Sequence, residues 1–559
     1  TGRHLGRGVR RPHPFHPDHR AVLVRRQQAE GRHRPRAGGE PESADRLPTH
    51  PRCGCRLDRV HPLPDRQGAR RRRRGAAGLR GIGRGHGPVR SHPGDVRRPD
   101  RRGDRRRERR PQPHRSPDGR RRGFPSILMS EAFAPVDVII AKRDGRELSD
   151  AQIDWVVDAY TRGAVADEQM SALAMAILLN GMNEREIVRW TEAMIASGTR
   201  MDFSNFDAPS VDKHSTGGVG DKITLPLVPI VAACGAVVPQ LSGRGLGYFG
   251  GTLDKMESIP GWRALLSNDE MKDVMRASGG VICAAGDGLA PADKKLYSLR
   301  DVTGTVEAIP LIASSIMSKK IAEGAGGLVL DVKTGNGAFM SDLPRAQKLA
   351  RTMVKIGNDA GVRTRALITA MDVPLGLAVG NAIEVTESLE VLAGGGPHDL
   401  IELVLALARE MLDIAGIDAD PQAAITSGKA MDHWNAMVTA QGGDPHAPLP
   451  RAPHEHVVTA PTTGTLTKLE AYGVGVAAWR LGAGRARKED AIAHGAGIWL
   501  HAKPGDHLAA GQPLMTLLTD DDTRFPAAIA ELDGAYELDG EPMDRLPLII
   551  ERLDESTKD

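Results

Sequence analysis

Between residues 211 and 380, the sequence repeats one pattern: a short apolar run, then a glycine-rich loop, then a stretch with helical spacing. In the clearest copies, mainly apolar segments at 211, 328–332 and 366–369 are followed by glycine loops at 217–220, 335–337 and 376–380, respectively. This alternation is typical of an α/β sheet. Because open α/β sheets bind ligands at the carboxyl ends of their strands, the glycine loops are candidate ligand-binding loops.

A helical pattern precedes this part of the chain. Three amphipathic stretches begin at Ser149, Asp167 and Asn183, and Gln152 completes a capping box with Ser149. They predict a small all-helical unit within residues 130–196.

The C-terminal part, residues 453–559, has a β-type pattern. Three segments are expected to form strands: 460–466, 473–479 and 503–514. The last of them, KPGDHLAAGQPL, has the pattern of strand, tight turn and strand. It resembles a biotinyl-type hammerhead, but no lysine stands at the tight turn between its strands. We therefore expect an α+β, hammerhead-like domain that serves packing and is not a carrier.

Residues 1–128 differ in composition from the rest. They hold 36 Arg, no Lys and 12 acidic residues, a net charge of +24, whereas the remainder carries −20. Such a segment cannot bury enough apolar surface to offset its ordering entropy, so we expect a disordered extension. Arginine without lysine is typical of a GC-rich stretch read out of frame, and we predict natural initiation at or near Met129. A targeting segment would be shorter and richer in serine, and a genuine disordered, nucleic-acid-binding tail is the remaining alternative.

Cysteine usage and hydropathy indicate the compartment. Cys53 and Cys55 lie in the arginine-rich extension, and Cys234 and Cys283 stand in apolar surroundings. Neither a disulfide framework nor a zinc site is predicted from them. The sequence has no run of about 18 apolar residues that could span a membrane. We expect a cytoplasmic protein with neither membrane nor nucleic acid as a partner.

The most informative segment is DKHSTGGVGD, residues 212–221. Its glycines let the backbone approach a ligand, while Lys213, Ser215 and Thr216 add a positive charge and hydroxyl donors. The loop suits a phosphate, although it is neither a Walker A loop nor a GxGxxG fingerprint. A glycine-rich turn without a ligand is the alternative.

A second polar glycine loop follows in SGRGLGYFGGTLDKME, residues 242–257. Ser242 and Thr252 supply hydroxyl groups, and two such loops on adjacent strands can enclose one oxyanion. For Arg244 and Asp254 we expect an internal ion pair that holds the loop, in preference to ligand contact.

A third segment contains APADKKLYSLRD and IASSIMSKK, within residues 290–320. Tyr297 and Arg300 lie three positions apart, and Ser315 and Lys319 four, so each pair shares a face if both stretches are helical. Together these groups would suit a planar ring with carbonyl oxygens that gains negative charge. Surface salt bridges are the alternative explanation for Arg300 and Lys319.

These motifs, in this order and spacing, resemble the thymidine phosphorylase and pyrimidine-nucleoside phosphorylase family, from about Val136 to the C-terminus. The resemblance implies a homodimer, with an active site in each subunit between a small helical domain and a large mixed α/β domain. It places the helical domain at residues 130–196 joined by about 292–322. The α/β domain takes 209–290 and 323–440.

The resemblance also assigns the site residues. Phosphate would be bound by Lys213, Ser215, Thr224, Ser242 and Thr252. The base would be bound by Arg300, Ser315 and Lys319, with His214 near a carbonyl oxygen of the base. Neither a metal nor a cofactor takes part in this assignment, since inorganic phosphate is the co-substrate of the pyrimidine deoxynucleoside.

Cleavage of a glycosidic bond by phosphate needs no protein nucleophile, because phosphate itself attacks C1′ while the base leaves as an anion. Arg300 and Lys319 would stabilise the charge on the leaving base. His214 is the neutral-range group beside the first loop and could protonate a ring oxygen. Alternatively, His214 only shapes the loop.

Three residues depart from the family pattern. Tyr248 and Phe249 make the wall beside the phosphate loop bulkier and more apolar, and Gln240 removes a cationic contact to ribose. We therefore predict phosphorolysis of thymidine and deoxyuridine to the free base and 2-deoxy-α-D-ribose 1-phosphate. A broad-specificity enzyme that also uses uridine is the alternative. An anthranilate phosphoribosyltransferase is disfavoured, because such enzymes lack the KHSTGG lysine and the SxxxK pair.

In some bacterial relatives a monovalent cation joins the helix after the first loop to a later loop. The matching positions are Gly220, Lys222, Leu375, Ala378 and Glu387. Lys222 stands where those relatives offer a threonine oxygen, and its ammonium would repel a cation. We expect this ammonium to donate to Glu387 and to the free carbonyl groups instead. Orientation toward solvent is the alternative.

Overall fold

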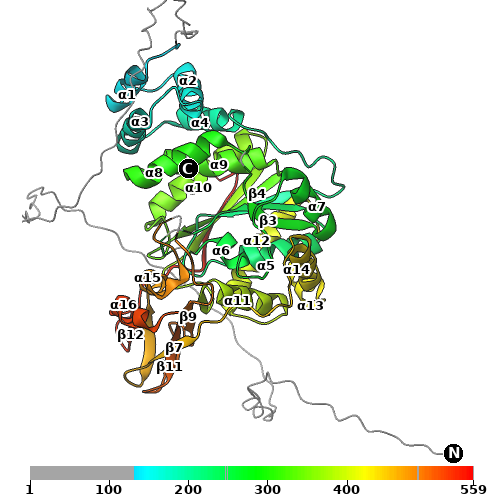
Figure 1. Cartoon of the computed structure of the whole chain (residues 1–559), viewed down its shortest axis with the longest axis vertical. Coiled ribbons are helices and arrows are strands. Elements are labelled where there is room, and N and C mark those ends of the chain that lie inside the picture. Colours follow the sequence, from blue (N-terminus) through cyan, green and yellow to red (C-terminus); the bar gives the residue numbers. More distant parts are fainter. Residues whose placement is uncertain (1–130, 246, 249, 287, 488–489, 558–559) are drawn as a thin grey trace, which may run out of the picture. The chain divides into compact units, whose positions relative to one another are not determined.

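The computed structural model describes residues 131–245, 247–248, 250–286, 288–487 and 490–557 (Figure 1). The predictions made for residues 1–128 and for Met129 lie outside these residues. In the described part, the predicted fold class is confirmed: a helical bundle, an α/β part built on a mainly parallel sheet, and a β-rich C-terminal part. None of the described helices is both long and apolar enough to cross a membrane.

Four helices form the bundle at the start of the described chain. They are α1 (Pro135–Arg143), α2 (Asp150–Thr161), α3 (Asp167–Asn180) and α4 (Glu184–Ala196). The capping box predicted at Ser149 begins α2, and α4 begins at Asn183 as predicted, there too with a capping box; each side chain accepts a backbone N–H from the first turn of its helix.

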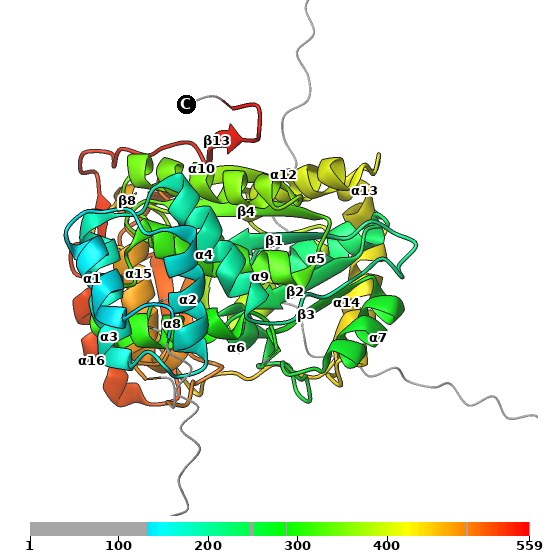
Figure 2. The same cartoon turned by 90° about the horizontal axis from the view of Figure 1, so that it is seen from above.

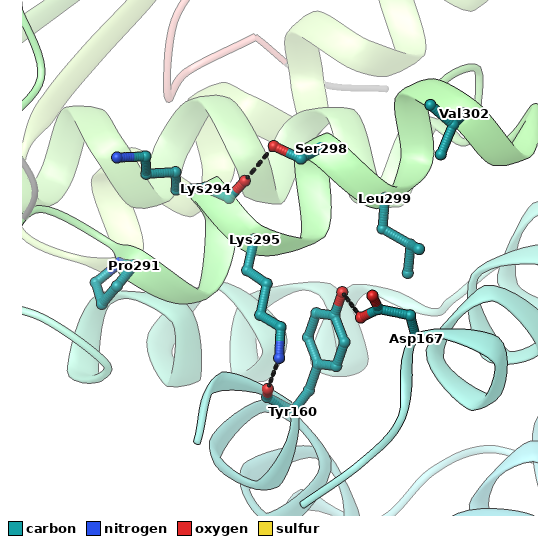
Figure 3. Close-up of a pocket in the computed structure, with 8 residues that line it drawn as sticks. All are labelled: Tyr160, Asp167, Pro291, Lys294, Lys295, Ser298, Leu299 and Val302. Atoms are coloured by element: carbon teal, nitrogen blue, oxygen red, sulfur yellow. Dashed lines mark hydrogen bonds between the residues drawn. The ribbon is translucent and has the colours of Figure 1, made fainter. Parts of the chain in front are cut away.

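Two later helices pack on this bundle: α8 (Pro291–Thr303) and α9 (Ile309–Glu323). Leu296 and Leu311 share one apolar core with the first four helices. Figure 3 shows the contact of α8 with α2 and α3, where Lys295 donates to the Tyr160 carbonyl oxygen at 2.6 Å and its ammonium lies 4.1 Å from the centroid of the Tyr160 ring. The Tyr160 hydroxyl in turn donates to Asp167 at 3.1 Å. A segment far along the chain therefore completes the bundle.

The central sheet has the order β1-β4-β5-β13. Its strands are β1 (Val211–Ser215), β4 (Gly327–Thr334), β5 (Arg363–Ala370) and β13 (Ile549–Leu553). The first three are parallel, and β13 adds an antiparallel edge. A parallel pair, β2 (Val238–Ser242) and β3 (Gly280–Ala284), lies beside β1, with a parallel bridge between Ser210 and Val237 (Figure 2). The loops after β1, β2 and β4 consequently lie along one edge of the sheet.

Helices cover both faces of the sheet. Along β4, which is completely buried, Val329 packs toward α12 (His398–Ala415), whereas Leu328 and Leu330 pack toward α10 (Leu343–Asp359). This alternation places a core on each side of the strands. The other described helices of this part are α5 (Thr224–Ala233), α6 (Thr252–Met256), α7 (Asn268–Ser278), α11 (Ala382–Leu392), α13 (Pro421–Thr426) and α14 (Lys429–Ala440).

The C-terminal part forms two small sheets with the orders β6-β9-β11-β7 and β10-β8-β12, and the edge strand β6 comes from the α/β part. The strands are β6 (Ala378–Gly380), β7 (His454–Thr459), β8 (Gly464–Leu469), β9 (Gly497–Leu500), β10 (His507–Leu508), β11 (Pro513–Thr519) and β12 (Tyr536–Leu538), and the helices are α15 (Ala471–Ala478) and α16 (Phe525–Glu531). Lys503 donates to the Pro374 carbonyl oxygen and, at 3.1 Å, to Asp399. This lysine therefore packs against the α/β part, which agrees with the expected packing role.

The strand expected at residues 473–479 is wrong. These residues belong to α15 and to the π-helical turn that follows it. The segment is buried on nearly all sides, so its continuous apolar run carries no periodicity that could separate strand from helix. Gly475 also lets the helix approach Val219, because a β-carbon there would lie only 2.7 Å from a Val219 methyl group.

Candidate active site

The first glycine loop leaves the carboxyl end of β1, and Lys213 lies beneath it. This side chain is only 1% exposed, and the Nζ atom has a hydroxyl neighbour, Thr224 Oγ1, at 3.4 Å. Burial lowers the pKa of Lys213, although the carboxylates of Asp221 and Asp331 oppose this shift. The result is a buried ammonium, weakly hydrogen bonded, at a loop suited to an anion.

Ser215 and Asp221 connect the two ends of the same loop. Ser215 Oγ donates to Asp221 Oδ2 at 2.5 Å and accepts the Gly217 backbone N–H at 3.1 Å. Burial opposes ionisation of Asp221, but the ammonium groups of Lys333 and Lys213 outweigh it and lower the pKa of Asp221. The carboxylate therefore stays charged and holds the Ser215 hydroxyl in place.

Sequence reasoning missed a buried ion pair in the third glycine unit. Lys333 Nζ lies 2.8 Å from Asp331 Oδ2, and both side chains are fully buried in β4. The Lys333 backbone N–H donates to Thr216 Oγ1 at 2.9 Å, which joins β4 to the first loop. The available signal was a charged pair that directly continues the apolar run 328–330.

His214 points to the opposite face of β1 from Lys213 and is partly buried. Burial and the nearby ammonium groups of Lys320, Lys319 and Lys213 lower its pKa well below 6.5. The imidazole is therefore neutral at pH 7 in the ligand-free site, and the expected neutral-range acid is not found there. As a neutral ring, His214 can donate one N–H hydrogen bond to a carbonyl oxygen.

The second glycine loop joins Ser242, at the end of β2, to Thr252, at the start of α6. The expected ion pair between Arg244 and Asp254 is wrong. Arg244 instead donates to Glu257 at the surface, while Asp254 is buried and lies 2.9 Å from Arg485 of the C-terminal part. Arg244 was expected to pair with Asp254 because the two are close in the sequence, whereas Arg485 stands more than 200 positions after Asp254.

Asp254 and Arg485 nevertheless hold the loop. Asp254 accepts the Gly245 backbone N–H at 2.6 Å, and Arg485 donates to the Gly245 carbonyl oxygen at 3.3 Å. Nearby, the rings of Tyr248 and Tyr472 meet edge to face with centroids 5.0 Å apart. Tyr248 therefore contacts the C-terminal part, whereas Phe249 lies outside the described residues.

Lys319 and Ser315 lie on one face of α9, as their spacing predicted. Lys319 Nζ donates to Ser315 Oγ at 3.0 Å and to Asp293 Oδ2 of α8. The Lys319 side chain is about one-third exposed, and its ammonium lies 5.9 Å from the centroid of the Tyr297 ring. Asp293, which the sequence analysis did not select, is buried and fixes the direction of Lys319.

Arg300 is buried deeper than a ligand-binding arginine usually is, with 1% of its surface exposed. Its guanidinium donates to three backbone carbonyl oxygens: Thr305 at 3.3 Å and Val306 at 2.7 Å in the α8–α9 connection, and Leu311 at 3.0 Å in the first turn of α9. Burial lowers the pKa of Arg300 to about 10, so it remains charged at neutral pH. A guanidinium has five N–H donors, so these three hydrogen bonds leave two donors that can bind a base.

Gln240, a position expected to influence sugar preference, is buried in β2. Its amide nitrogen donates to the Leu241 carbonyl oxygen at 2.9 Å. The side chain is neutral, so a cation does not stand at this position.

Lys222 is completely buried and donates to Glu387 Oε2 at 2.6 Å and to the Leu375 carbonyl oxygen at 2.8 Å. The predicted contacts of the ammonium with Glu387 and a free carbonyl are therefore confirmed, and orientation toward solvent is excluded. The Lys222 ammonium itself occupies the position that a monovalent cation would take beside Glu387 and the Leu375 carbonyl oxygen, so these residues do not fit such an ion. Elsewhere in the described chain, groups of three or more His, Cys, Asp or Glu arranged to hold a metal ion are not found.

Three family descriptions match the chain. The glycosyl transferase family helical bundle domain covers residues 136–198, the glycosyl transferase family a/b domain covers 207–436, and the pyrimidine nucleoside phosphorylase C-terminal domain covers 465–539. Together with the two glycine loops and the buried lysine, they define a three-part glycosyl transferase.

Individual relatives narrow this class. The chain is 59% identical over 423 residues to thymidine phosphorylase of Mycobacterium tuberculosis H37Rv, which covers 76% of this chain and 99% of that protein. It is 49% identical over 395 residues to pyrimidine-nucleoside phosphorylase of Bacillus subtilis, covering 68% and 91% respectively. The chain belongs to the thymidine and pyrimidine-nucleoside phosphorylase family.

Among solved structures, anthranilate phosphoribosyltransferase of Thermus thermophilus is similar with a TM-score of 0.45 and 17% identity, over 55% of this chain and 99% of that one. This likeness is too distant to bear on the fold or the function.

Proposed function

We propose that this chain catalyses the phosphorolysis of thymidine and deoxyuridine to the free base and 2-deoxy-α-D-ribose 1-phosphate. The observation that carries the proposal is the buried Lys213 ammonium, which lies at a glycine loop and whose one hydrogen bond within the described part of the chain is a 3.4 Å contact to the Thr224 hydroxyl. A buried cation with so few hydrogen bonds is suited to an anionic co-substrate. The 59% identity to a thymidine phosphorylase supports the same reaction.

The phosphate half of the site would use Lys213, Ser215, Thr224, Ser242 and Thr252. In this assignment, Lys213 neutralises the dianion while the hydroxyl groups and loop amides orient one oxygen toward C1′ of the sugar. Attack forms the C1′–O bond as the C1′–N1 bond breaks, and the bonding electron pair leaves with the pyrimidine ring.

The base half of the site would use Lys319, Ser315 and Arg300. Lys319, directed by Asp293, stabilises negative charge on the departing ring, and Ser315 donates to a ring heteroatom. The neutral His214 donates a hydrogen bond to a carbonyl oxygen of the base. Arg300 contributes its positive charge while its hydrogen bonds shape the loop that ends α8.

The subunit arrangement and compartment are part of the same proposal. We infer a homodimer in the cytoplasm that uses phosphate as co-substrate and needs no cofactor. The exposed apolar side chains Val136, Met175, Leu179 and Val302 on the helical bundle support contact with a second copy. The thiols of Cys234 and Cys283 are both free, which suits a reducing compartment.

Base release from thymidine, deoxyuridine and uridine, followed by ultraviolet absorbance, tests the substrate preference. With the neutral Gln240 at its position, we expect the deoxynucleosides to have the higher kcat/KM. Equal kcat/KM for uridine would replace the proposal by a broad-specificity pyrimidine-nucleoside phosphorylase.

A further inference from the structure

A buried ammonium joins three elements that carry the proposed site. Lys320, at the end of α9, donates to Asp212 Oδ2 of β1, to Glu323 Oε2 at 3.0 Å, and to the Leu241 carbonyl oxygen of β2 at 3.2 Å. The three charged side chains of this cluster are each at most 4% exposed. The proposed mechanism uses none of them.

Lys320 itself and two of its partners stand next to residues of the proposed site. Asp212 directly precedes Lys213, Leu241 directly precedes Ser242, and Lys320 itself follows Lys319. The ammonium therefore connects the strands of the phosphate half-site with the helix of the base half-site. No other side chain described here bonds to β1, β2 and α9 together.

The end of α9 is also fixed by its backbone. Gly324, which ends the helix, has a φ of +85°, and a β-carbon there would collide with the Met201 carbonyl oxygen. At the other end, the Leu311 carbonyl oxygen accepts from Arg300. Neither of these contacts reaches β1 or β2, so the hydrogen bonds of Lys320 are the ones that link this end of α9 to both strands.

We propose that Lys320 is a positioning residue, which fixes α9 against β1 and β2 so that a base bound by Lys319 and Ser315 is aligned with the phosphate bound at Lys213. This inference rests on the proposed function and adds a residue that touches neither substrate. Because reacting groups must be aligned closely, a shift of about 1 Å can cost roughly 100-fold in rate.

The charge of the cluster agrees with this role. Burial and Asp212 raise the pKa of Glu323 well above its usual range, which favours the neutral form of its carboxyl group. Lys320 and Asp212 then form a neutral pair, and Glu323 supplies further hydrogen bonding. Because the buried Lys320–Asp212 pair carries no net charge, it can hold β1 and α9 together without competing with Lys213 for phosphate.

Lys320→Met is the first test. We expect kcat for thymidine to fall by about 100-fold or more. The phosphate KM should change by less than about threefold, because the phosphate-binding groups stay on their own strands. The rise of the melting temperature on adding phosphate should also persist. Lys355→Met is the matched control, since Lys355 is an exposed lysine on α10 paired with Asp359 at 3.3 Å, and it should behave as the unmutated protein.

The double variant Lys320→Met/Asp212→Asn separates positioning from stability. It removes the unpaired buried carboxylate that the single change leaves, so the melting temperature should recover while kcat stays low. Recovery of kcat together with stability would overturn the inference, as would an unchanged kcat in the single variant. Failure of both variants to fold would also overturn it, because Lys320 would then act on folding alone.

The same measurements distinguish this inference from the proposed function. If the unmutated protein and the Lys355→Met control release no base in phosphate, the proposed function fails and this inference fails with it. If they are active and the Lys320 variants are equally active, only the positioning role is contradicted.

Discussion

The ammonium of Lys222 lies 2.6 Å from Glu387 Oε2, and both side chains are at most 1% exposed. The other carboxylate oxygen of Glu387 accepts the Leu377 backbone N–H at 2.7 Å. Gly376 between them leaves no space for a side chain, since a β-carbon there would lie 2.8 Å from Lys222 Nζ. The pair therefore ties the segment that precedes α5 to α11, and its hydrogen bonds with Leu375 and Leu377 add the loop before β6.

This arrangement predicts that the protein needs no potassium. In a buffer free of sodium and potassium, base release and the melting temperature should both equal those measured with potassium added. Strong activation of the unmutated protein by potassium would contradict the role given to Lys222.

Lys222→Thr should uncover Glu387. We expect either a new dependence on potassium or a loss of stability that could reach roughly 3 to 5 kcal/mol, because a buried carboxylate loses its partner. Burial alone would lower the pKa of Lys222, but Glu387 outweighs burial and raises it. The contribution of the pair should thus persist through the neutral range and be lost only above pH 10.5, the ordinary value. Chemical denaturation of both proteins, with and without potassium, measures this loss, and equal stability would count against it.

Lys213→Ala should mainly damage phosphate use. Because its ammonium lies under the first loop, its loss should raise the apparent KM for phosphate at saturating thymidine. An unchanged phosphate KM would remove Lys213 from the site. The exposed Lys355→Met serves again as control.

Lys319→Ala should damage the departure of the base. We expect kcat to fall by roughly 100- to 1,000-fold, the usual cost of one donor that stabilises developing charge. Asp293→Asn should give a smaller loss in kcat, since Asp293 only directs Lys319. A raised phosphate KM with normal kcat in Lys319→Ala would place this lysine in the other half of the site.

Arg300→Ala should lower both kcat and stability, because the guanidinium also holds three backbone carbonyl oxygens. Steady-state kinetics and the melting temperature together check this outcome. Loss of stability with normal kcat would make Arg300 a structural residue only.

The lowered pKa of His214 is measurable directly. Its imidazole should titrate well below 6.5 in the ligand-free protein, as seen by nitrogen NMR and assigned by loss of the signal in His214→Gln. The free energy of unfolding should therefore decrease as pH falls below 6.5, because His214 of the unfolded chain binds a proton that His214 of the folded chain does not. A midpoint at or above 6.5 would restore His214 as an acid of the neutral range.

Local signals in the sequence were enough for some parts of this structure. Ser149 and Asn183 begin helices as predicted, because a cap depends on residues three positions away. Lys319 and Ser315 likewise meet on one helix face. Lys222 was placed correctly because the resemblance named its partner, Glu387.

Long-range pairing explains what the sequence could not predict. Asp254 bonds to Arg485 and Lys320 to Asp212, and no local spacing encodes either contact. The lowered pKa of His214 depends on its burial and on ammonium groups of α9 and β1, which only the folded chain brings together. Asp293 was passed over because its partner Lys319 stands on the next helix, 26 positions later.

The central claim, phosphorolysis of thymidine, is tested most directly by incubating the full chain with thymidine in the presence and absence of inorganic phosphate. We expect thymine release only with phosphate, with one sugar 1-phosphate formed for each thymine. Thymine release without phosphate, giving free deoxyribose, would show hydrolysis and contradict the account. So would the absence of thymine release with phosphate present.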